Sequence, residues 1–224
     1  MKNLKKSLLI QSDFDNTITV GNVSEQIHAE FGPSNWPQIY KKYKKKLITV
    51  EESNIYSFKN LNVRKSVLDD FVKANVKFRA GFLDFINYIN IQKIDFKIVS
   101  SGVDFYIKSA LSSLNLDGLE TISGKSHFTD IGMEISYFDI NNELIVNNFK
   151  YSYTKHHKTK YDNIIYFGDS GTDINASKIS DVVFATDKLS DYYKNNKLPY
   201  YKFDNFFDVL KVIKNDNLTK SNIL

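Results

Sequence analysis

The stretch Ser7-Leu8-Leu9-Ile10-Gln11-Ser12-Asp13-Phe14-Asp15-Asn16-Thr17 decides how the rest of the chain is interpreted. Its apolar run predicts a buried β-strand, and its polar end predicts a reaction centre just beyond that strand. Side chains alternate between faces in an extended chain, so Asp13 and Asp15 point to one side while Phe14 points into the core. Two such carboxylates can divide the roles of nucleophile and proton donor, and phosphoryl transfer through an aspartyl phosphate needs that pair.

Length and composition set the limits of the interpretation. The chain has 224 residues, enough for one globular domain or for a core domain with a smaller companion. Its net charge of +4 comes from lysines spread along the chain, which is no nucleic-acid signature by itself. It contains no cysteine, which excludes disulfides and cysteine nucleophiles. The apolar run 8–10 is too short for a signal peptide, and no stretch reaches transmembrane length, so we expect a cytoplasmic protein.

A group of helices is predicted directly after the first strand. Asn22-Val23-Ser24-Glu25 resembles a capping box, and Thr49-Val50-Glu51-Glu52 is a complete one. Apolar residues at helical spacing follow each box, and the second helix has Ile39, Tyr40, Tyr43 and Leu47 on one face. The basic run 41–46 is interpreted as a solvated helix face, because that is the usual place of such runs.

The rest of the chain alternates between strands and helices. Residues 94–99 and 163–167 are apolar runs that predict buried strands, and each is followed by a helical pattern. This alternation predicts a parallel sheet with right-handed crossovers, in which ligands gather at the carboxyl ends of the strands. We expect two or three short strands within 119–138, a last core strand at 182–184 and a closing helix near 206–213.

Polar groups follow three of the predicted strands. Besides the first stretch, one strand ends in Ser100-Ser101-Gly102 and another in Gly168-Asp169-Ser170-Gly171-Thr172-Asp173. At one edge of a sheet, the acids could hold Mg²⁺ while hydroxyl and amide donors hold phosphate. A carboxylate can approach a phosphate dianion only when cations cancel the repulsion, so a metal ion and one lysine are expected nearby.

Topology selects that lysine among the four that precede the strand at 163–167. Lys150, Lys155, Lys158 and Lys160 are the candidates. A crossover helix runs opposite to the strands, so its start lies at the catalytic edge. A helix from 151 to 160 would separate Lys150 from Lys160 by about 15 Å. We therefore predict Lys150 at the phosphate, with Lys155 as the alternative if the helix starts later.

These motifs resemble those of the haloacid dehalogenase-like phosphatases. Asp13-Phe14-Asp15-Asn16-Thr17, Ser100 and Gly168–Asp173 match three family motifs in the right order, and the helical insert matches the type-one cap. The resemblance implies that Asp13 is the nucleophile and Asp15 the general acid and base. It also implies a phosphate site at Thr17, Ser100, Ser101, Gly102 and Lys150, and a Mg²⁺ site at Asp13, Asp15, Asp169 and Asp173.

The same resemblance implies the domain organisation. We expect a Rossmann-like α/β core, residues 1–20 and 76–224, with a small α-helical cap domain, residues 21–75, inserted after the first strand. Phe31-Gly32-Pro33-Ser34-Asn35-Trp36 and Phe184-Ala185-Thr186-Asp187-Lys188-Leu189 are similar to segments of one branch of the family. That branch contains the 2-hydroxy-3-keto-5-methylthiopentenyl-1-phosphate and phosphoserine phosphatases.

The expected partner is a small phosphorylated metabolite. The methylthiopentenyl phosphate or a similar sugar-like phosphate is favoured, and phosphoserine is the alternative. Glu25 and Arg79 are further candidates for contacting the substrate. A phosphotransferase and a non-catalytic phosphate-binding protein remain open as other functions. We expect no nucleic-acid or membrane partner and a monomer or homodimer. His156 and His157 are expected to be surface residues, because adjacent positions on a helix face different directions.

Overall fold

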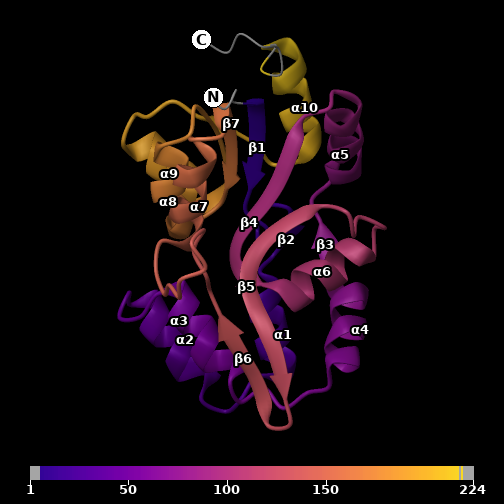
Figure 1. Ribbon diagram of the computed structural model, residues 1–224, viewed down its shortest axis with the longest axis vertical. Coiled ribbons are helices and arrows are strands. Elements are labelled where there is room, and N and C mark those ends of the chain that lie inside the picture. Colours follow the sequence, from indigo (N-terminus) through magenta and orange to yellow (C-terminus); the bar gives the residue numbers. More distant parts are fainter. Residues whose placement is uncertain (1–5, 217, 219–224) are drawn as a thin grey trace.

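A seven-stranded sheet forms the centre of the computed structural model, which describes residues 6–216 and 218 (Figure 1). The strand order is β6-β5-β4-β1-β7-β8-β9. The strands are β1 (Lys6–Ser12), β4 (Asp95–Val103), β5 (Glu120–Thr129), β6 (Gly132–Ser136), β7 (Tyr161–Gly168), β8 (Val182–Ala185) and β9 (Tyr201–Lys202). Every neighbouring pair is parallel except β5 with β6. The predicted α/β sheet is confirmed, with β1 between β4 and β7.

Helices cover both faces of the sheet. In Figure 1, α5 (Phe82–Ile91) and α10 (Phe206–Asn215) lie to the right of β1, while α7 (Phe149–His157), α8 (Ile174–Lys178) and α9 (Asp187–Asn195) lie to its left. The rings of Phe85 on α5 and Phe206 on α10 contact Phe167 of β7, so apolar burial fixes that layer. The helix α6 (Asp104–Ser112) follows β4 directly and packs on β5.

Four of the five helices between β1 and β4 form an insertion. They are α1 (Val23–Phe31), α2 (Trp36–Lys44), α3 (Val50–Phe58) and α4 (Lys65–Asn75), and α1 to α3 lie in the lower part of Figure 1. Asn22 accepts a hydrogen bond from the Glu25 amide, and Thr49 forms the predicted reciprocal box with Glu52. The short strands β2 (Thr19–Val20) and β3 (Lys77–Phe78) pair antiparallel and close the insertion at its base.

The segment 119–138 differs from its prediction. It forms two strands, within the predicted number of two or three, but β5 is ten residues long where a short strand was expected, and it makes one hairpin with the five-residue strand β6. The hairpin extends beyond the rest of the sheet, and β6 packs on α3. A Cβ atom at Gly132 would overlap the carbonyl oxygen of Lys59, just after α3. The absence of a side chain at Gly132 therefore allows the hairpin backbone to touch the inserted helices.

Several boundaries also differ from the prediction. The strand β4 continues through residues 100–103, past a shift between Val99 and Val103 in its pairing register with β5. Leu47 lies beyond the end of α2 and is 69% exposed, so it is not on the helix face where it was expected. Neither α9 nor β9 was predicted. No helix within residues 6–216 is both long and apolar enough to cross a membrane.

Candidate active site

A cavity of about 1050 Å³ lies between the carboxyl ends of the central strands and the inserted helices. The core side of its wall is mostly charged and polar, and it includes Asp13, Ser100, Lys150 and Asp169. Its other side comes from α2 and α3 and the loop that joins them, with Trp36, Tyr40, Tyr43 and Glu51 among its residues. The three strand ends that carried polar motifs in the sequence therefore open into one space.

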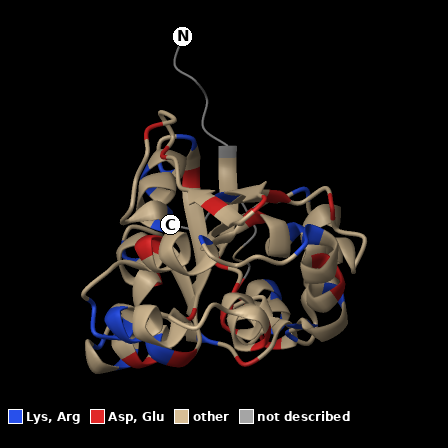
Figure 2. Ribbon diagram, turned by 90° about the horizontal axis from the view of Figure 1, so that it is seen from below, with Lys and Arg blue, Asp and Glu red and all other residues tan. Residues whose placement is uncertain are grey.

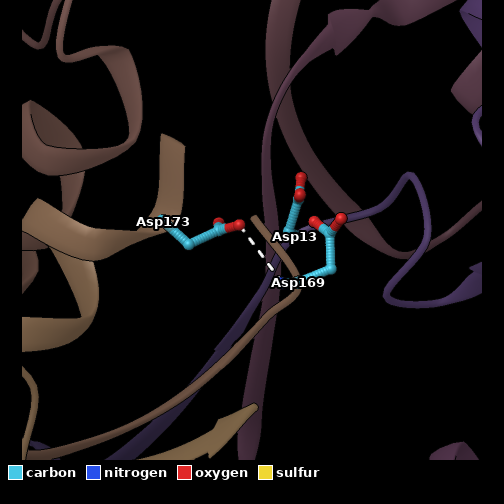
Figure 3. Close-up of side chains that lie close together, drawn as sticks. All are labelled: Asp13, Asp169 and Asp173. Atoms are coloured by element: carbon cyan, nitrogen blue, oxygen red, sulfur yellow. Dashed lines mark hydrogen bonds between the residues drawn. The ribbon is translucent and has the colours of Figure 1, made fainter. Parts of the chain in front are cut away.

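Three buried carboxylates converge at this edge (Figure 3). Asp13 follows β1, Asp169 follows β7, and Asp173 ends the short 3-10 helix Gly171–Asp173. Each offers an oxygen within 4.8 Å of the others. The Asp173 carboxylate accepts hydrogen bonds from the Asp169 amide at 3.2 Å and from the Tyr166 hydroxyl at 2.7 Å. Backbone and side-chain donors thus hold the cluster in place.

Lys150 neutralises part of this charge. It lies in the first turn of α7, and its Nζ atom is 2.6 Å from Asp13 Oδ2 and 2.7 Å from Asp173 Oδ1. Burial alone would lower the pKa of Lys150, but the carboxylates of Asp13, Asp173 and Asp169 raise it above its ordinary value. Lys150 is therefore charged at the catalytic edge, as the topological argument placed it. Lys155 and Lys160 are exposed.

The set of donors suits a divalent cation. One lysine faces three carboxylates, so negative charge remains in excess. Asp13 Oδ1 is buried and has no hydrogen-bond partner among the described residues. Burial, reinforced by the charge of Asp173, raises the pKa of Asp169 well above its usual range. Carboxylate oxygens are the ligands that Mg²⁺ prefers, and such a cation would offset the excess charge.

Asp15 lies in a different environment from the acid cluster. Its Oδ1 accepts the Val23 amide hydrogen at 2.6 Å, and its Oδ2 accepts the Tyr106 hydroxyl hydrogen at 2.7 Å. Burial raises the pKa of Asp15 to about 7, although these two hydrogen bonds lower it. A carboxyl group with this pKa can both donate and accept a proton near neutral pH. Its side chain is not among the three that form the cluster, so its predicted role as a metal ligand is not supported by the geometry.

The end of β4 brings hydroxyl and amide groups to the cavity. Ser100 Oγ accepts the Gly102 amide hydrogen at 3.0 Å, and both residues line the cavity. A Cβ atom at Gly102 would overlap the Tyr106 hydroxyl, which bonds Asp15. The glycine is therefore required for the approach of Tyr106. The Ser101 hydroxyl bonds Glu51, and its carbonyl oxygen accepts hydrogen bonds from Asn54 and Tyr137.

Two predicted site residues lie elsewhere. Thr17 is fully buried and does not line the cavity, and its hydroxyl has no hydrogen-bond partner among the described residues. Arg79 donates hydrogen bonds to the backbone carbonyl oxygens of Asn16, Thr17 and Asp204. These bonds occupy its guanidinium, and Arg79 does not line the cavity, so the structure contradicts its prediction as a substrate clamp. Glu25 does line the cavity, where Tyr40 donates a hydrogen bond to it.

Other functional groups were missed in the sequence because their contacts span large separations. Tyr106 reaches Asp15 across 91 residues, and Asn54 reaches the Ser101 carbonyl across 47. His157 was expected at the surface but is buried, and its Nδ1 atom lies 2.8 Å from Gln11 Oε1. That prediction is wrong because α7 turns His157 toward β1. No motif spacing signals such contacts.

Basic side chains lie near the mouth of the cavity. Figure 2 views this end of the molecule from below, and blue residues gather at its lower left, on the side where Figure 1 has α2 and α3. Lys44 and Lys46, from the predicted basic run, are exposed and line the cavity. The solvated-face interpretation is correct for their exposure. Their positive charge at the opening also favours the approach of an anion.

Two proteins named 2-hydroxy-3-keto-5-methylthiopentenyl-1-phosphate phosphatase are similar over nearly the whole chain. The protein from Brevibacillus brevis is 27% identical over 217 residues, which cover 94% of this chain and 97% of its own. The protein from Bacillus mycoides is 28% identical over 213 residues, which cover 93% and 96%. No family model matches the chain.

Solved structures of phosphoserine phosphatase share the fold. A phospho-aspartyl intermediate analogue of that enzyme superposes with a TM-score of 0.63 at 16% identity, covering 94% of this chain and 99% of the other. A substrate-bound complex gives a TM-score of 0.65 at 15% identity, covering 93% and 99%. The motif order, the sheet topology and these two kinds of similarity agree. The chain has the fold of these phosphoserine phosphatases, it is similar in sequence to the two named phosphatases, and its motifs resemble those of the haloacid dehalogenase-like phosphatases.

Proposed function

We propose that the chain is a Mg²⁺-dependent phosphatase that hydrolyses a small phosphorylated metabolite through an aspartyl phosphate on Asp13. The observation that supports this most directly is the state of the Asp13 carboxylate. One oxygen is held by Lys150 at 2.6 Å, and the other is buried without a partner among the described residues. A carboxylate fixed by one oxygen and free at the other is well placed to attack phosphorus.

The residues of the chain then divide the reaction in two steps. Asp13 Oδ1 forms a bond to phosphorus while the ester oxygen leaves and takes the proton from Asp15. In the second step, the Asp15 carboxylate takes a proton from water, and the water oxygen attacks the aspartyl phosphate to release inorganic phosphate. A pKa of about 7 suits Asp15 to both tasks. Ser100, the Gly102 amide and the charged Lys150 hold the phosphoryl oxygens.

A Mg²⁺ ion would be held by Asp13, Asp169 and Asp173, the three carboxylates that converge at this edge. When bound, it would offset the repulsion between the Asp13 carboxylate and a phosphate dianion. Lys150 supplies the remaining positive charge from the protein itself, because its Nζ atom already contacts two of these carboxylates. The Asp15 side chain is not proposed as a ligand.

Residues 21–75 are proposed as a cap that selects the leaving group. Side chains of α2 and α3 form the wall opposite the acid cluster, so they would face the part of the substrate that departs. Two relatives carry the name of a methylthiopentenyl phosphate phosphatase, and that compound is the favoured substrate. The aromatic wall of Trp36, Tyr40 and Tyr43 supports a partly apolar leaving group.

A screen of phosphorylated metabolites, each with and without Mg²⁺, tests this function. The expected result is phosphate release from a small metabolite monoester that requires Mg²⁺ and stops on chelation. The panel should include the methylthiopentenyl phosphate, phosphoserine and several sugar phosphates. Adding an alcohol acceptor separates a hydrolase from a phosphotransferase, because a transferase would form a new ester. No turnover of any monoester at any Mg²⁺ concentration would refute the proposal.

A further inference from the structure

Glu51 on α3 is a buried carboxylate that faces the cavity from the side opposite the acid cluster. It is 3% exposed and lines the cavity. Its neighbour Glu52 is the residue that caps the helix, with Oε2 2.8 Å from the Thr49 amide nitrogen. The Glu51 side chain instead reaches toward the core, to residues 50 and 98 positions away in the sequence. Helix capping therefore does not explain its presence.

The contacts of Glu51 are too weak to satisfy a buried charge. Its Oε1 accepts from the Ser101 hydroxyl at 3.3 Å and from the Phe149 amide at 3.4 Å. Ordinary hydrogen bonds of these kinds are about 2.8 and 2.9 Å long. Among the residues that the structure describes, Glu51 has no ion pair. Asp15 shows the contrast, with bonds of 2.6 and 2.7 Å to its two oxygens. Burying a carboxylate with such poor hydrogen bonds costs free energy unless a bound ligand donates the hydrogen bonds that are missing.

The position of Glu51 points to the kind of ligand. Its two contacts are to Ser101 and Phe149, each next in sequence to a residue of the proposed phosphate site, Ser100 or Lys150. A substrate whose phosphate contacts Ser100 and Lys150 would therefore bring its first carbon atoms toward Glu51. The carboxylate is a hydrogen-bond acceptor only, so its natural partner there is a donor.

We propose that Glu51 binds a hydrogen-bond donor, a hydroxyl or an ammonium group, that the leaving group carries close to the ester oxygen. This assignment rests on the proposed phosphatase function and deepens it. Glu51 is thus a specificity-determining residue, which accepts monoesters with such a donor and disfavours those without one. A site built to hydrogen-bond a donor rejects the analogue that lacks it, because its buried acceptor then stays unpaired.

Three monoesters with a two-carbon chain test the assignment: ethyl phosphate, 2-hydroxyethyl phosphate and O-phosphoethanolamine. They differ only in having no donor, a hydroxyl or an ammonium group. With Mg²⁺, the wild-type enzyme should hydrolyse at least one donor ester with a kcat/KM about tenfold or more above that of ethyl phosphate. Equal kcat/KM values for all three would overturn the inference while leaving the phosphatase function intact. No turnover of these esters or of any ester in the metabolite panel would instead refute the phosphatase function.

Two substitutions distinguish the donors. Glu51→Leu removes the acceptor, so the preference for either donor ester should fall to within about twofold of ethyl phosphate. Glu51→Gln keeps a neutral acceptor, so a hydroxyl preference should largely persist and an ammonium preference should be lost. Glu30→Gln is the matched control, because Glu30 is an exposed carboxylate on α1 that does not line the cavity. If Glu51 only held α3 against the core, its substitution would lower kcat/KM for all three esters by one common factor and leave their ratios unchanged, which would overturn the inference.

Discussion

The two ends of α7 each bury a basic side chain, and the pKa values of the two are shifted in opposite directions. Lys150 in the first turn and His157 in the last are both at most 5% exposed. Lys150 contacts the carboxylates of Asp13 and Asp173, which raise its pKa despite burial. His157 contacts the neutral amide of Gln11, and burial together with the charge of Lys97 lowers its pKa to about 4.

The two groups are about equally buried, so the opposite directions of their pKa shifts come from their partners. A cation among carboxylates is kept at the catalytic edge, where a phosphate would need it. A neutral imidazole against a neutral amide is kept at the other end of the helix, where it contributes to packing. Four substitutions sharpen or break this contrast, from the largest expected effect to the smallest.

Asp13→Asn is expected to have the largest effect. The amide is a poor nucleophile and a weak metal ligand, and it removes one of the charges that hold Lys150. Turnover should fall to the background rate, while the circular dichroism spectrum stays that of the wild type. Phosphate release measured with saturating Mg²⁺ checks this. Activity within about tenfold of the wild type would contradict the nucleophile assignment.

Asp15→Asn should lower kcat by about 10²- to 10⁴-fold, the usual contribution of a general acid or base. The asparagine can neither protonate the leaving group nor activate water. Any aspartyl phosphate that forms should therefore persist, and intact-mass measurement after rapid quenching should detect a phosphorylated chain. Full turnover without a detectable phosphorylated chain would exclude this role for Asp15.

Lys150→Ala should lower kcat by on the order of a hundredfold, as expected for the loss of one charge-stabilising donor. Lys155→Ala is the matched control on the same helix, and it should be near neutral because that side chain is exposed. Both variants should be compared at equal folded fraction, judged by thermal melting in Mg²⁺. A larger loss of kcat in Lys155→Ala than in Lys150→Ala would contradict the assignment of Lys150 to the phosphate.

His157→Gln is expected to have little effect on turnover and a measurable effect on acid stability. The pKa of His157 is about 4 in the folded chain and 6.5 in its ordinary state, so the unfolded chain binds the extra proton first as pH falls. The wild type should therefore lose about 2 kcal/mol from this group between about pH 7 and pH 5. Urea titrations at both pH values should show that loss in the wild type and a smaller one in the variant. An equal loss in both would show that His157 is not the group responsible.

The sequence predicted the charged half of the site well, for a physical reason. Asp13, Asp169 and Asp173 follow apolar strands, and parallel strands end at one edge, so local pattern and topology together place them. Lys150 followed from the direction of a crossover helix. Each of these predictions depends on the position of a strand or a helix, and the periodicity of apolar residues in the sequence indicates those positions.

The rest of the site depends on tertiary contacts that periodicity does not report. Glu51 was recognised only as part of a capping box, although its side chain leaves the helix for the core. Arg79 was expected at the substrate but is held by three backbone carbonyl oxygens. In the sequence, a residue that binds a ligand cannot be told from one that stabilises the fold. Only its neighbours in space distinguish the two.

Gly132 has a consequence for the mechanics of the molecule. The hairpin β5–β6 is anchored in the sheet at one end and touches the inserted helices near Lys59 at the other. Because Gly132 has no side chain, the backbone of the hairpin can lie directly against the backbone that follows α3. A side chain added at position 132 would press against the backbone at Lys59 and change the packing of β6 on α3, without touching any group that lines the cavity.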